Sequence, residues 1–506
     1  MKRVLLFFVS ILVSVHVVYS QQDLRVRSDC KELEGAFAWA KEKALSFVVT
    51  GQRGPVDIYK EDQISDTVDY IPSYWAGYPL RTAFYSRDFC HQVIGAHLLG
   101  LEVENFTMMR AFAQSADASK RWFPLWAINF DGSTYKLDYR SSNNFVREIP
   151  AVFELVEKNL ELYRWTSDHR YLNDPHIWEF CSKAVSEFIT LHDGDFKNGV
   201  AESTGTGDIF VGTATYNEYR DQTLIEAGDG ISSQYKALES FGILAQQRGD
   251  LELSRTYSKR ASALKTYFNT DWGVRGNKEL YNRGYDLAKN PVAGWGNENS
   301  WFLPMKEITD VESVRHLNYL DYIDEQLSSA TGLPKNIEAI TYIPEIFFKY
   351  SQNERGWKWL KHIMANIDQR HITGALTGTN GNYPEVSFVL IRNIVHDMAG
   401  ISPGDHPSVI QTCSHLPSEI SNIEIDDVKV GDAIFSIRHE GTENSTFQMN
   451  SDGPAKIWRA TFLGNHSYLT VNGKKFKSKK KILRGYAISY IDIKVEDDKP
   501  VAVSCI

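Results

Sequence analysis

The sequence is poor in cysteine and lacks the short motifs of metal, nucleotide and serine chemistry. Its five cysteines lie far apart among 506 residues and are odd in number, which excludes a disulfide framework and a CxxC metal site; one long-range disulfide stays open. No HExxH, GxSxG, P-loop or dinucleotide-binding pattern occurs. We therefore expect no metal and no cofactor.

The chain also lacks a surplus of basic residues. It has 55 Lys and Arg against 64 Asp and Glu, which gives a net charge of −9 at pH 7. No basic face with interleaved aromatic residues is present, so nucleic acid is not an expected partner. The one basic run, KKFKSKKK at residues 474–481, is either a solvated hairpin with charged edges or a patch for a polyanion.

Only one long apolar run is present, and it lies at the start of the chain. Lys2 and Arg3 precede the apolar residues 4–18, and Ser20 precedes Gln21, which is the pattern of a cleavable secretory signal over residues 1–20. No other stretch approaches the ~20 apolar residues of a membrane span. We therefore expect an exported protein, periplasmic or extracellular, without stable membrane insertion.

The rest of the chain shows hydrophobic periodicity of two kinds. Up to about residue 408 the apolar spacing is helical, and we expect helices at 29–49, 88–100, 102–116, 147–163, 171–192, 226–247, 250–269, 298–306, 309–329, 336–350, 354–367 and 384–399. After that point apolar residues alternate with period 2 between Gly, Asn and Asp turns. This pattern predicts a small antiparallel β-sandwich over residues 409–506.

The expected helices differ in how much of their surface is apolar. Segment 309–329 is amphipathic, whereas 384–399 is apolar around most of its circumference and 88–100 nearly so. A helix that is apolar all round is buried, so every second helix is expected to be an inner one. The fold class that follows is mainly α: six helical hairpins that close into an (α/α)6 barrel over residues 21–408. Pro344 must kink or shorten the tenth helix.

In such a barrel the starts of all six inner helices surround one mouth. A carboxylate lies at or beside each start, at Asp88, Glu148, Glu226, Asp229, Glu298, Glu338 and Glu385. Capping of the helix explains each of them taken singly. It does not explain the Trp, Asn and Arg residues beside them, which together with carboxylates suit a carbohydrate pocket. Glycoside hydrolysis needs two carboxyl groups, about 6.5–9.5 Å apart in inverting enzymes.

At this point the chain resembles the six-hairpin glycosidase superfamily. The motifs that carry the resemblance are YWAGYPLRTAFYSRDFCHQVIGAHLLGL, FVREIPAVFEL, YNEYRDQTLIEAGDGI, GWGNENSWFLPMK, PKNIEAITYIPE and NYPEVSFVLIRN, across residues 65–400. More narrowly, the chain is similar to secreted glycan-degrading proteins whose relatives include exo-acting uronidases and rhamnosidases. The resemblance implies an exported, exo-acting, inverting glycoside hydrolase that acts on a carbohydrate substrate.

The resemblance also implies roles for individual residues. Glucoamylase-like members carry the acid before the third inner helix and the base before the sixth, which points here to Glu218, or Asp229 beyond it, as acid and to Glu385 as base. Asp88 fits the position used by unsaturated-glucuronyl hydrolases, and Glu298 is an alternative acid. The residues expected to bind substrate are Trp75, Tyr85, Arg87, Trp126, Arg147, Tyr216, Asn217, Asp229, Trp295, Asn297, Trp301, Lys306, Asn336 and Tyr383.

Other interpretations stay open at this point. Arg81, Arg87, Arg147 and Lys306 would hold the carboxylate of a uronic acid, or each neutralises a nearby carboxylate of the protein. A polysaccharide lyase would act through Tyr216, Tyr383, Asn217 and Arg87 in place of the glutamates. A non-catalytic glycan-binding protein would need the aromatic residues alone. His91 and His97, on a buried helix, are expected to be satisfied core residues.

Overall fold

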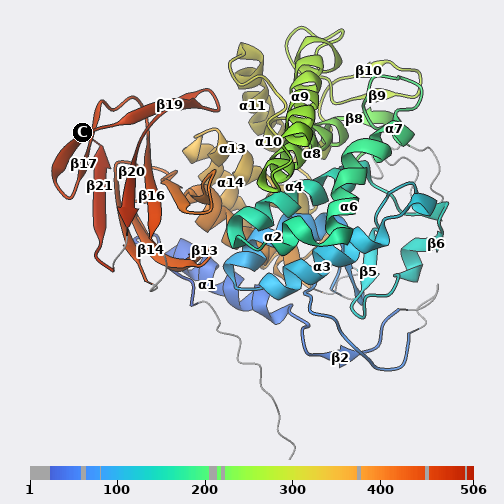
Figure 1. Cartoon of the computed structure of the whole chain (residues 1–506), viewed down its shortest axis with the longest axis horizontal. Coiled ribbons are helices and arrows are strands. Elements are labelled where there is room, and N and C mark those ends of the chain that lie inside the picture. Colours follow the sequence, from blue (N-terminus) through green and yellow to red (C-terminus); the bar gives the residue numbers. More distant parts are fainter. Residues whose placement is uncertain are drawn as a thin grey trace, which may run out of the picture.

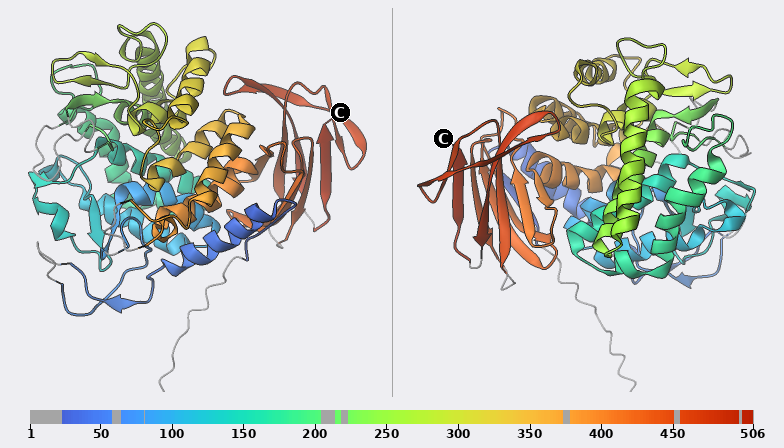
Figure 2. Two further views of the ribbon diagram at one scale, coloured as in Figure 1. Left: turned by 180° about the vertical axis from the view of Figure 1, so that it is seen from behind. Right: turned by 45° about the horizontal axis from the view of Figure 1, so that its top comes forward.

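The computed structural model describes residues 23–57, 64–79, 81–203, 214–217, 223–372, 378–450, 455–495 and 498–505 (Figure 1). A helical part of the chain is followed by a β-rich part, and Figure 2 shows the two packed against each other from two further sides. The expected signal segment, 1–20, lies outside the described residues. No helix among the described residues is long and apolar enough to cross a membrane.

The helices follow the expected order closely. Those buried on nearly all sides are α2 (Ser86–Leu98), α4 (Ile149–Thr166), α8 (Gly228–Gln247), α10 (Glu298–Met305), α12 (Ile337–Thr341), α13 (Ile343–Lys349) and α15 (Pro384–Arg392). Those with one exposed face are α1 (Lys31–Ser46), α3 (Glu102–Ser115), α6 (Pro175–Lys183), α9 (Leu251–Tyr267), α11 (Val314–Leu327) and α14 (Asn353–Ala365), with short α5 (Arg170–Asn173) and α7 (Ile189–His192). The expected alternation of buried and amphipathic helices is confirmed.

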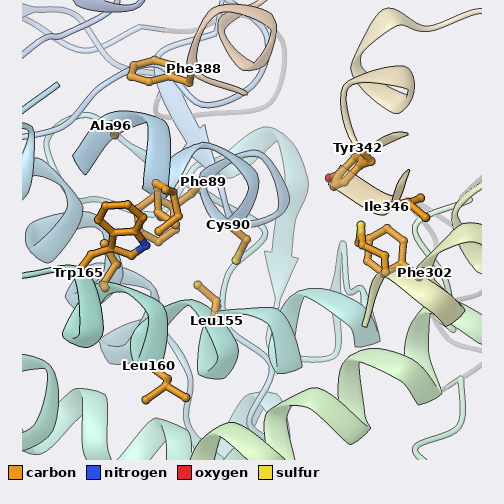
Figure 3. Packing of buried hydrophobic residues seen from close by; sticks show 14 of the residues in the cluster. Phe89, Cys90, Ala96, Leu155, Leu160, Trp165, Phe302, Tyr342, Ile346 and Phe388 are labelled. Atoms are coloured by element: carbon orange, nitrogen blue, oxygen red, sulfur yellow. The ribbon is translucent and has the colours of Figure 1, made fainter. Parts of the chain in front are cut away.

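The buried helices touch one another in a closed ring. Contacts run from α2 to α4, α8, α10, α13 and, through α12, to α15, which packs back on α2. The break between α12 and α13 falls before Pro344, because proline lacks the N–H that a continuous helix needs. Side chains such as Phe89, Leu155, Phe302 and Phe388 fill the space between these helices (Figure 3).

The approach of α2 to α15 is especially close. A Cβ at Gly95 would lie 2.0 Å from the backbone oxygen of Phe388, so only glycine fits between the two helices there. The first and last buried helices are therefore held together backbone to backbone, at the point where the ring closes.

The β-rich part contains two sheets, but its strands are not all antiparallel. The sheet orders are β1-β13-β14-β15-β21-β17-β18 and β11-β12-β16-β20-β19. Their strands are β1 (Arg25–Ser28), β11 (Ile401–Pro403), β12 (Val409–Cys413), β13 (Asn422–Val430), β14 (Ala433–Glu440), β15 (Asn444–Met449), β16 (Lys456–Leu463), β17 (Tyr468–Val471), β18 (Lys474–Lys477), β19 (Lys479–Leu483), β20 (Tyr486–Val495) and β21 (Val501–Cys505). The expectation of a purely antiparallel sandwich is wrong, because β12 pairs with β16 in parallel.

Two strands of these sheets come from outside the segment 409–506. β1 lies ahead of the first helix and pairs with β13, and β11 precedes residue 409 and pairs with β12. The N-terminal end of the helical part is thus tied into the β-sheets. None of the five cysteines, all within the described residues, forms a disulfide.

Short strand pairs lie in the loops between the helices. They are β2 (Arg53–Gly54) with β3 (Val68–Asp69), β4 (Ala83–Tyr85) with β5 (Ala127–Asn129), β6 (Tyr139–Ser141) with β7 (Asn144–Phe145), and β8 (Leu224–Ala227) with β9 (Gly284–Asp286) and β10 (Pro291–Val292). β4 leads directly into α2 and β8 into α8. These pairs therefore fix the loops at the N-terminal ends of the buried helices.

The β-sheets cover the opposite, C-terminal ends of the buried helices. The backbone N–H of Gly431 donates to the carbonyl of Trp165 at the end of α4, over 2.7 Å. His97, at the end of α2, contacts the carbonyl of Lys429 at 3.2 Å. Arg484, between β19 and β20, pairs with Glu307 just after α10. These contacts close one end of the ring. The N-terminal ends of the buried helices form the other end, which we call the mouth.

Candidate functional site

Buried carboxyl groups occupy the first turns of five different helices of the ring. They are Asp88 on α2, Asp229 on α8, Glu298 on α10, Glu338 on α12 and Glu385 on α15. Each is at most 8% exposed. The helix N-termini favour negative charge, yet burial of so many carboxyl groups is costly unless each has partners. The partners therefore define the site.

Asp88 and Glu385 form a coupled pair. Burial raises the pKa of Glu385 well above its usual value, and the charge of Asp88 and a hydrogen bond with it raise that pKa further. Burial also raises the pKa of Asp88, while Arg87 and the hydroxyl of Tyr383, which donates to Oδ1 over 2.8 Å, act in the opposite direction. Since two adjacent carboxylates cannot both ionise easily, each of the two opposes ionisation of the other.

His91 orients this pair from the next turn of α2. Its Nδ1 lies 2.9 Å from Oε1 of Glu385, and its ring stacks on Tyr342 with centroids 3.5 Å apart and planes 3° from parallel. Burial lowers the pKa of His91 well below its usual value, so the ring is neutral and Nδ1–H can donate to the carboxyl group. Sequence reasoning missed this role. The signal was available, because Asp88 and His91 are three residues apart and share a helix face.

Arg87 crosses the ring to reach Glu298. Its Nη2 lies 3.0 Å from Oε1 of Glu298, and Nη1 donates to the carbonyl of Tyr216 over 3.2 Å. Its guanidinium also lies 4.6 Å from the ring centroid of Tyr216. α2 and α10 are not neighbours in the ring, so this pair joins opposite walls. The salt bridge considered as an alternative for Arg87 is present, but with Glu298 and not with its sequence neighbour.

The loop before α8 is anchored by Asp229. This fully buried carboxyl group accepts hydrogen bonds from Thr215 Oγ1 at 2.7 Å and from the N–H of Tyr216 at 2.8 Å, and burial raises its pKa to about 7. Asn217 donates from Nδ2 to the carbonyl of Gly296 over 2.9 Å, which links this loop to the one before α10. Asp229 thus positions the loop. Glu218, which follows Asn217 in the sequence, lies outside the described residues.

Tyr383 and Glu338 lie beside the coupled pair. The ring of Tyr383 is parallel to that of His371, with an angle of 9° and centroids 5.6 Å apart. His371 Nε2 in turn lies 3.0 Å from Oε1 of Glu338. Glu338 Oε2 is buried without a hydrogen-bond partner. A buried carboxylate oxygen without a partner suits a ligand hydroxyl.

Lys306 does not lie at the mouth, and this expectation is wrong. It follows the last turn of α10, is 2% exposed, and pairs with Glu154 and Glu157 of α4. Glu154 also accepts a hydrogen bond from the hydroxyl of Tyr216 over 2.7 Å. Because α10 is eight residues long, its two ends differ in depth by about 12 Å. Lys306 therefore belongs to the interior of the ring.

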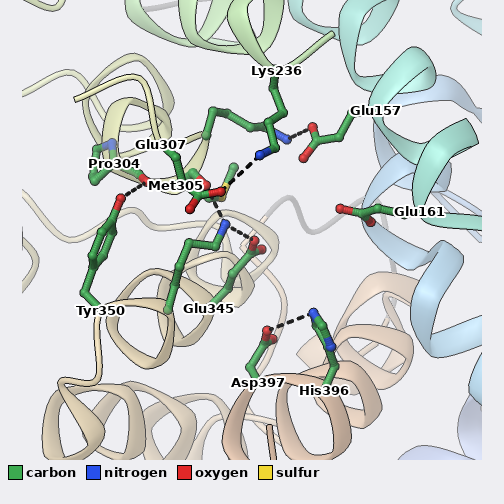
Figure 4. Close-up of polar contacts among 12 residues, drawn as sticks. Glu157, Glu161, Lys236, Pro304, Met305, Glu307, Glu345, Tyr350, His396 and Asp397 are labelled. Atoms are coloured by element: carbon green, nitrogen blue, oxygen red, sulfur yellow. Dashed lines mark hydrogen bonds and ion pairs between the residues drawn. The ribbon is translucent and has the colours of Figure 1, made fainter. Parts of the chain in front are cut away.

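More charged residues follow towards the C-terminal ends of the helices. Figure 4 shows Lys236 paired with Glu307, at 3.0 Å, and Lys349 joins Glu345 at 3.0 Å. Arg392 reaches the second oxygen of Glu345 at 2.6 Å. Opposite charges are paired throughout this region. Side chains fill the interior of the ring beneath the mouth, so the ring is not an open tunnel.

The aromatic residues expected as sugar platforms divide into two groups. Trp301 and Tyr85 are buried: Trp301 is 0% exposed and packs on Trp295, and Tyr85 packs edge-on against Trp126 with centroids 4.8 Å apart. A face buried in protein cannot stack on a sugar, so this expectation is wrong for these two. Trp75, Trp126 and Trp295 are half-buried, and Trp126 donates from Nε1 to Glu148 over 2.8 Å.

The remaining expected binding residues, Asn297, Asn336 and Arg147, differ in how far they are buried. Asn297, directly before α10, has φ +51° and ψ −121°, and its Oδ1 is buried without a partner. Such a backbone conformation is strained for a non-glycine residue and is typical of functional sites. Asn336, directly before α12, is exposed. Arg147 is buried with its guanidinium 5.2 Å from the ring centroid of Phe145.

Solved structures with a similar fold include glycosidases. Similar chains include an α-L-rhamnosidase from Dictyoglumus thermophilum (TM-score 0.60, 12% identity, 96% of this chain and 50% of that one). They also include a GH78 family rhamnosidase of Bacillus sp. GL1 (TM-score 0.56, 13% identity, 84% of this chain and 40% of that one). A third is a putative kojibiose phosphorylase from the human microbiome (TM-score 0.51, 9% identity, 94% of this chain and 63% of that one). The resemblance to the six-hairpin glycosidase fold is confirmed. The chain spans about half the length of the rhamnosidases it matches.

These similarities are confined to the fold. No protein-family model and no curated protein sequence matches the chain. Among the described residues no group of three or more His, Cys, Asp and Glu side chains is placed to hold a metal ion.

Proposed function

We propose that this protein is an exported glycoside hydrolase that releases a terminal sugar from an oligo- or polysaccharide with inversion of configuration. The closed ring of buried helices is the inner wall of an (α/α)6 barrel, and its mouth is the active site. The observation that carries the proposal is the gathering of buried carboxyl groups in the first turns of five helices of the ring, α2, α8, α10, α12 and α15. α15, which carries Glu385, and α8 are three steps apart in the ring of six.

Glu385 is the proposed general base and Glu218 the proposed acid. Neighbouring helices pack about 8–10 Å apart, so opposite walls leave several ångströms between inward-pointing carboxyl groups. Inverting hydrolysis needs such a gap of ~6.5–9.5 Å, to hold the sugar and the attacking water. Asp88 cannot be the second catalytic group beside Glu385, because the two hydrogen-bond to each other. Asp88 and Arg87 are proposed to bind the hydroxyls of the terminal sugar.

The environment of Glu385 suits a base. Burial and the charge of Asp88 raise its pKa, and a carboxylate with a raised pKa is a stronger base than one in water. The hydrogen bond from His91 keeps one oxygen oriented. When a sugar hydroxyl replaces Glu385 as the partner of Asp88, the base is released to accept a proton from water. Glu298 is the weaker candidate for the acid, because its carboxyl group is already paired with Arg87 at 3.0 Å.

The closed far end supports release of terminal sugars. Lys306, Glu154 and Glu157 fill the interior, and Arg484 closes the far end. A glycan chain can enter from the mouth but cannot pass through the ring. A pocket that is open at one end only accepts the end of a glycan, so cleavage takes place near that end.

A neutral sugar fits the charges at the mouth better than a uronic acid. Arg87 is paired with Glu298. Arg81 lies 3.8 Å from Asp138 and donates a hydrogen bond to the hydroxyl oxygen of Tyr85. The carboxyl groups at the helix starts outnumber the arginines there, so an additional carboxylate on the substrate would be repelled. Rhamnose, named in the structures of the same fold, is such a neutral sugar.

The lyase alternative is less well supported. Tyr216, which would abstract the proton, is 2% exposed and donates its hydroxyl to Glu154 inside the ring. Tyr383 already donates to Asp88. A binding protein without activity would not need a base with a raised pKa on one wall and a carboxylate-bearing loop on the other.

The test is hydrolysis of 4-nitrophenyl glycosides of neutral sugars and of glucuronic acid, with products followed by proton NMR. We expect a free monosaccharide of inverted anomeric configuration. Glu385→Gln is expected to lower kcat by at least 10³-fold, roughly as the loss of a general base does. Glu325→Gln, on the exposed face of α11, is the matched control and is expected to have no effect. An unsaturated product, or full activity of Glu385→Gln, contradicts the assignment.

A further inference from the structure

The basic run at residues 474–481 forms one edge of the β-rich part. β18 is the last strand of the seven-stranded sheet and β19 the last strand of the five-stranded sheet, and Ser478 connects them. We call this segment the lysine edge. It contributes six lysines, Lys474, Lys475, Lys477, Lys479, Lys480 and Lys481. All four residues of β18 are exposed.

The protein leaves most of this charge unpaired. Lys479 pairs with Asp492 at 2.9 Å, and within the described part of the chain no carboxylate lies at ion-pair distance from the other five lysines. The whole chain carries −9, so the lysine edge is a positive ridge on an otherwise negative molecule. Alternate lysines of one strand, such as Lys475 and Lys477, point to the same side about 6.6 Å apart.

Exposed aromatic and aliphatic residues lie among the lysines. Tyr468 and Phe476 are each 44% exposed and Ile482 is 64% exposed. Lys475 Nζ lies 4.2 Å from the ring centroid of Tyr468. Lysines that only protect a sheet edge from aggregation do not need exposed rings, which by themselves favour aggregation. The combination of rings and cations is suited to a ligand with flat apolar faces and anionic groups.

We propose that the lysine edge is a binding site for an anionic polysaccharide, one that carries carboxylate or sulfate groups. The site is separate from the mouth, because the β-sheets pack on the C-terminal ends of the buried helices. A linear polymer can follow two narrow edge strands. A bilayer or a nucleic acid duplex is broad and would extend beyond the ridge over a chain whose net charge is −9. This inference is independent of the proposed hydrolase activity.

The test measures binding of the full chain to immobilised polygalacturonate and dextran sulfate, with neutral dextran as reference. We expect binding to the two anionic polymers at 50 mM NaCl and none to dextran. The triple substitution K475Q/K477Q/K480Q is expected to weaken binding at least tenfold. It should reduce the slope of log K against log salt concentration by about two, since each cation contributes ~0.7–0.9. Tyr468→Ser should weaken binding without changing that slope.

A matched control removes the same charge elsewhere. Arg255, Lys259 and Lys278 are exposed on the helical part, and R255Q/K259Q/K278Q is expected to change affinity less than twofold. Equal weakening in the two triple variants would show a net-charge effect and overturn the site. Absence of binding to either anionic polymer would also overturn it. Equal binding to anionic phospholipid vesicles or to DNA at 150 mM NaCl would reject the polysaccharide as the ligand. Circular dichroism checks that both variants are folded.

Discussion

Replacing Lys306 by methionine should strongly destabilise the protein. Burial alone would lower the pKa of Lys306, but the charges of Glu154 and Glu157 raise it above its usual value, so the lysine is charged in the folded state. Its side chain is 3% exposed and those of the two glutamates are 3% and 7% exposed. Methionine fills a similar volume but leaves two carboxylates inside the ring without their shared cation. Breaking a buried ion pair from one side costs about 3–5 kcal/mol.

The assay is urea unfolding followed by tryptophan fluorescence, with Lys358→Met as the control. Lys358 pairs with Asp324 at 2.9 Å, but its side chain is 46% exposed, and such pairs contribute about 0–1 kcal/mol. The variant K306M/E154Q/E157Q should recover most of the lost stability, because both buried charges are then removed. This stabilising role of Lys306 is refuted if K306M lowers the free energy of unfolding no more than Lys358→Met does. It is also refuted if the triple variant is less stable than K306M.

Two further substitutions test the mouth and the closure of the ring. In Asp88→Asn the pKa of Glu385 falls, because a like charge beside it is removed. Activity that needs ionised Glu385 is lost as pH falls through that pKa, so the acidic limb of the pH–rate profile should move to lower pH; an unmoved limb refutes the coupling. Gly95→Ala should cost at least about 1–3 kcal/mol in urea unfolding, because its Cβ meets the backbone of Phe388. Gly35→Ala, in open space on α1, should stabilise by about 1 kcal/mol, and a similar loss in both variants would contradict the close approach of α2 and α15.

Local patterns were enough to find the long helices and the strands after residue 409, whereas the short strands β1 to β11 were not expected. The segment 384–399 is apolar on all sides in the sequence, and all nine residues of α15 are buried. Pro344 divides the tenth helix as its chemistry requires. The carboxylates at the helix starts could also be found, because each belongs to the same short segment as the helix it precedes. Secondary structure and burial are properties of consecutive residues, so one sequence is sufficient to indicate them.

The partners of the site residues could not be found in this way. Arg87 could pair with adjacent Asp88 or with any other carboxylate of the mouth. Its partner Glu298 is 211 residues away, and Glu385 is 294 residues away from His91. Packing of Trp295 on Trp301 decided that the Trp301 ring is buried, and the depth along α10 decided that Lys306 is inside the ring.

The sequence by itself determined an alternation of buried and amphipathic helices, a change to strands near residue 409, and a set of carboxylates at the starts of buried helices. Only the tertiary structure decided that Asp88 and Glu385 hydrogen-bond to each other, that Arg87 spans the mouth, and that β1 joins the β-sheets. The physical reason is that hydrophobic periodicity fixes which residues are buried. Closure of the ring fixes which distant charges meet, and their meeting sets the pKa values on which the chemistry depends.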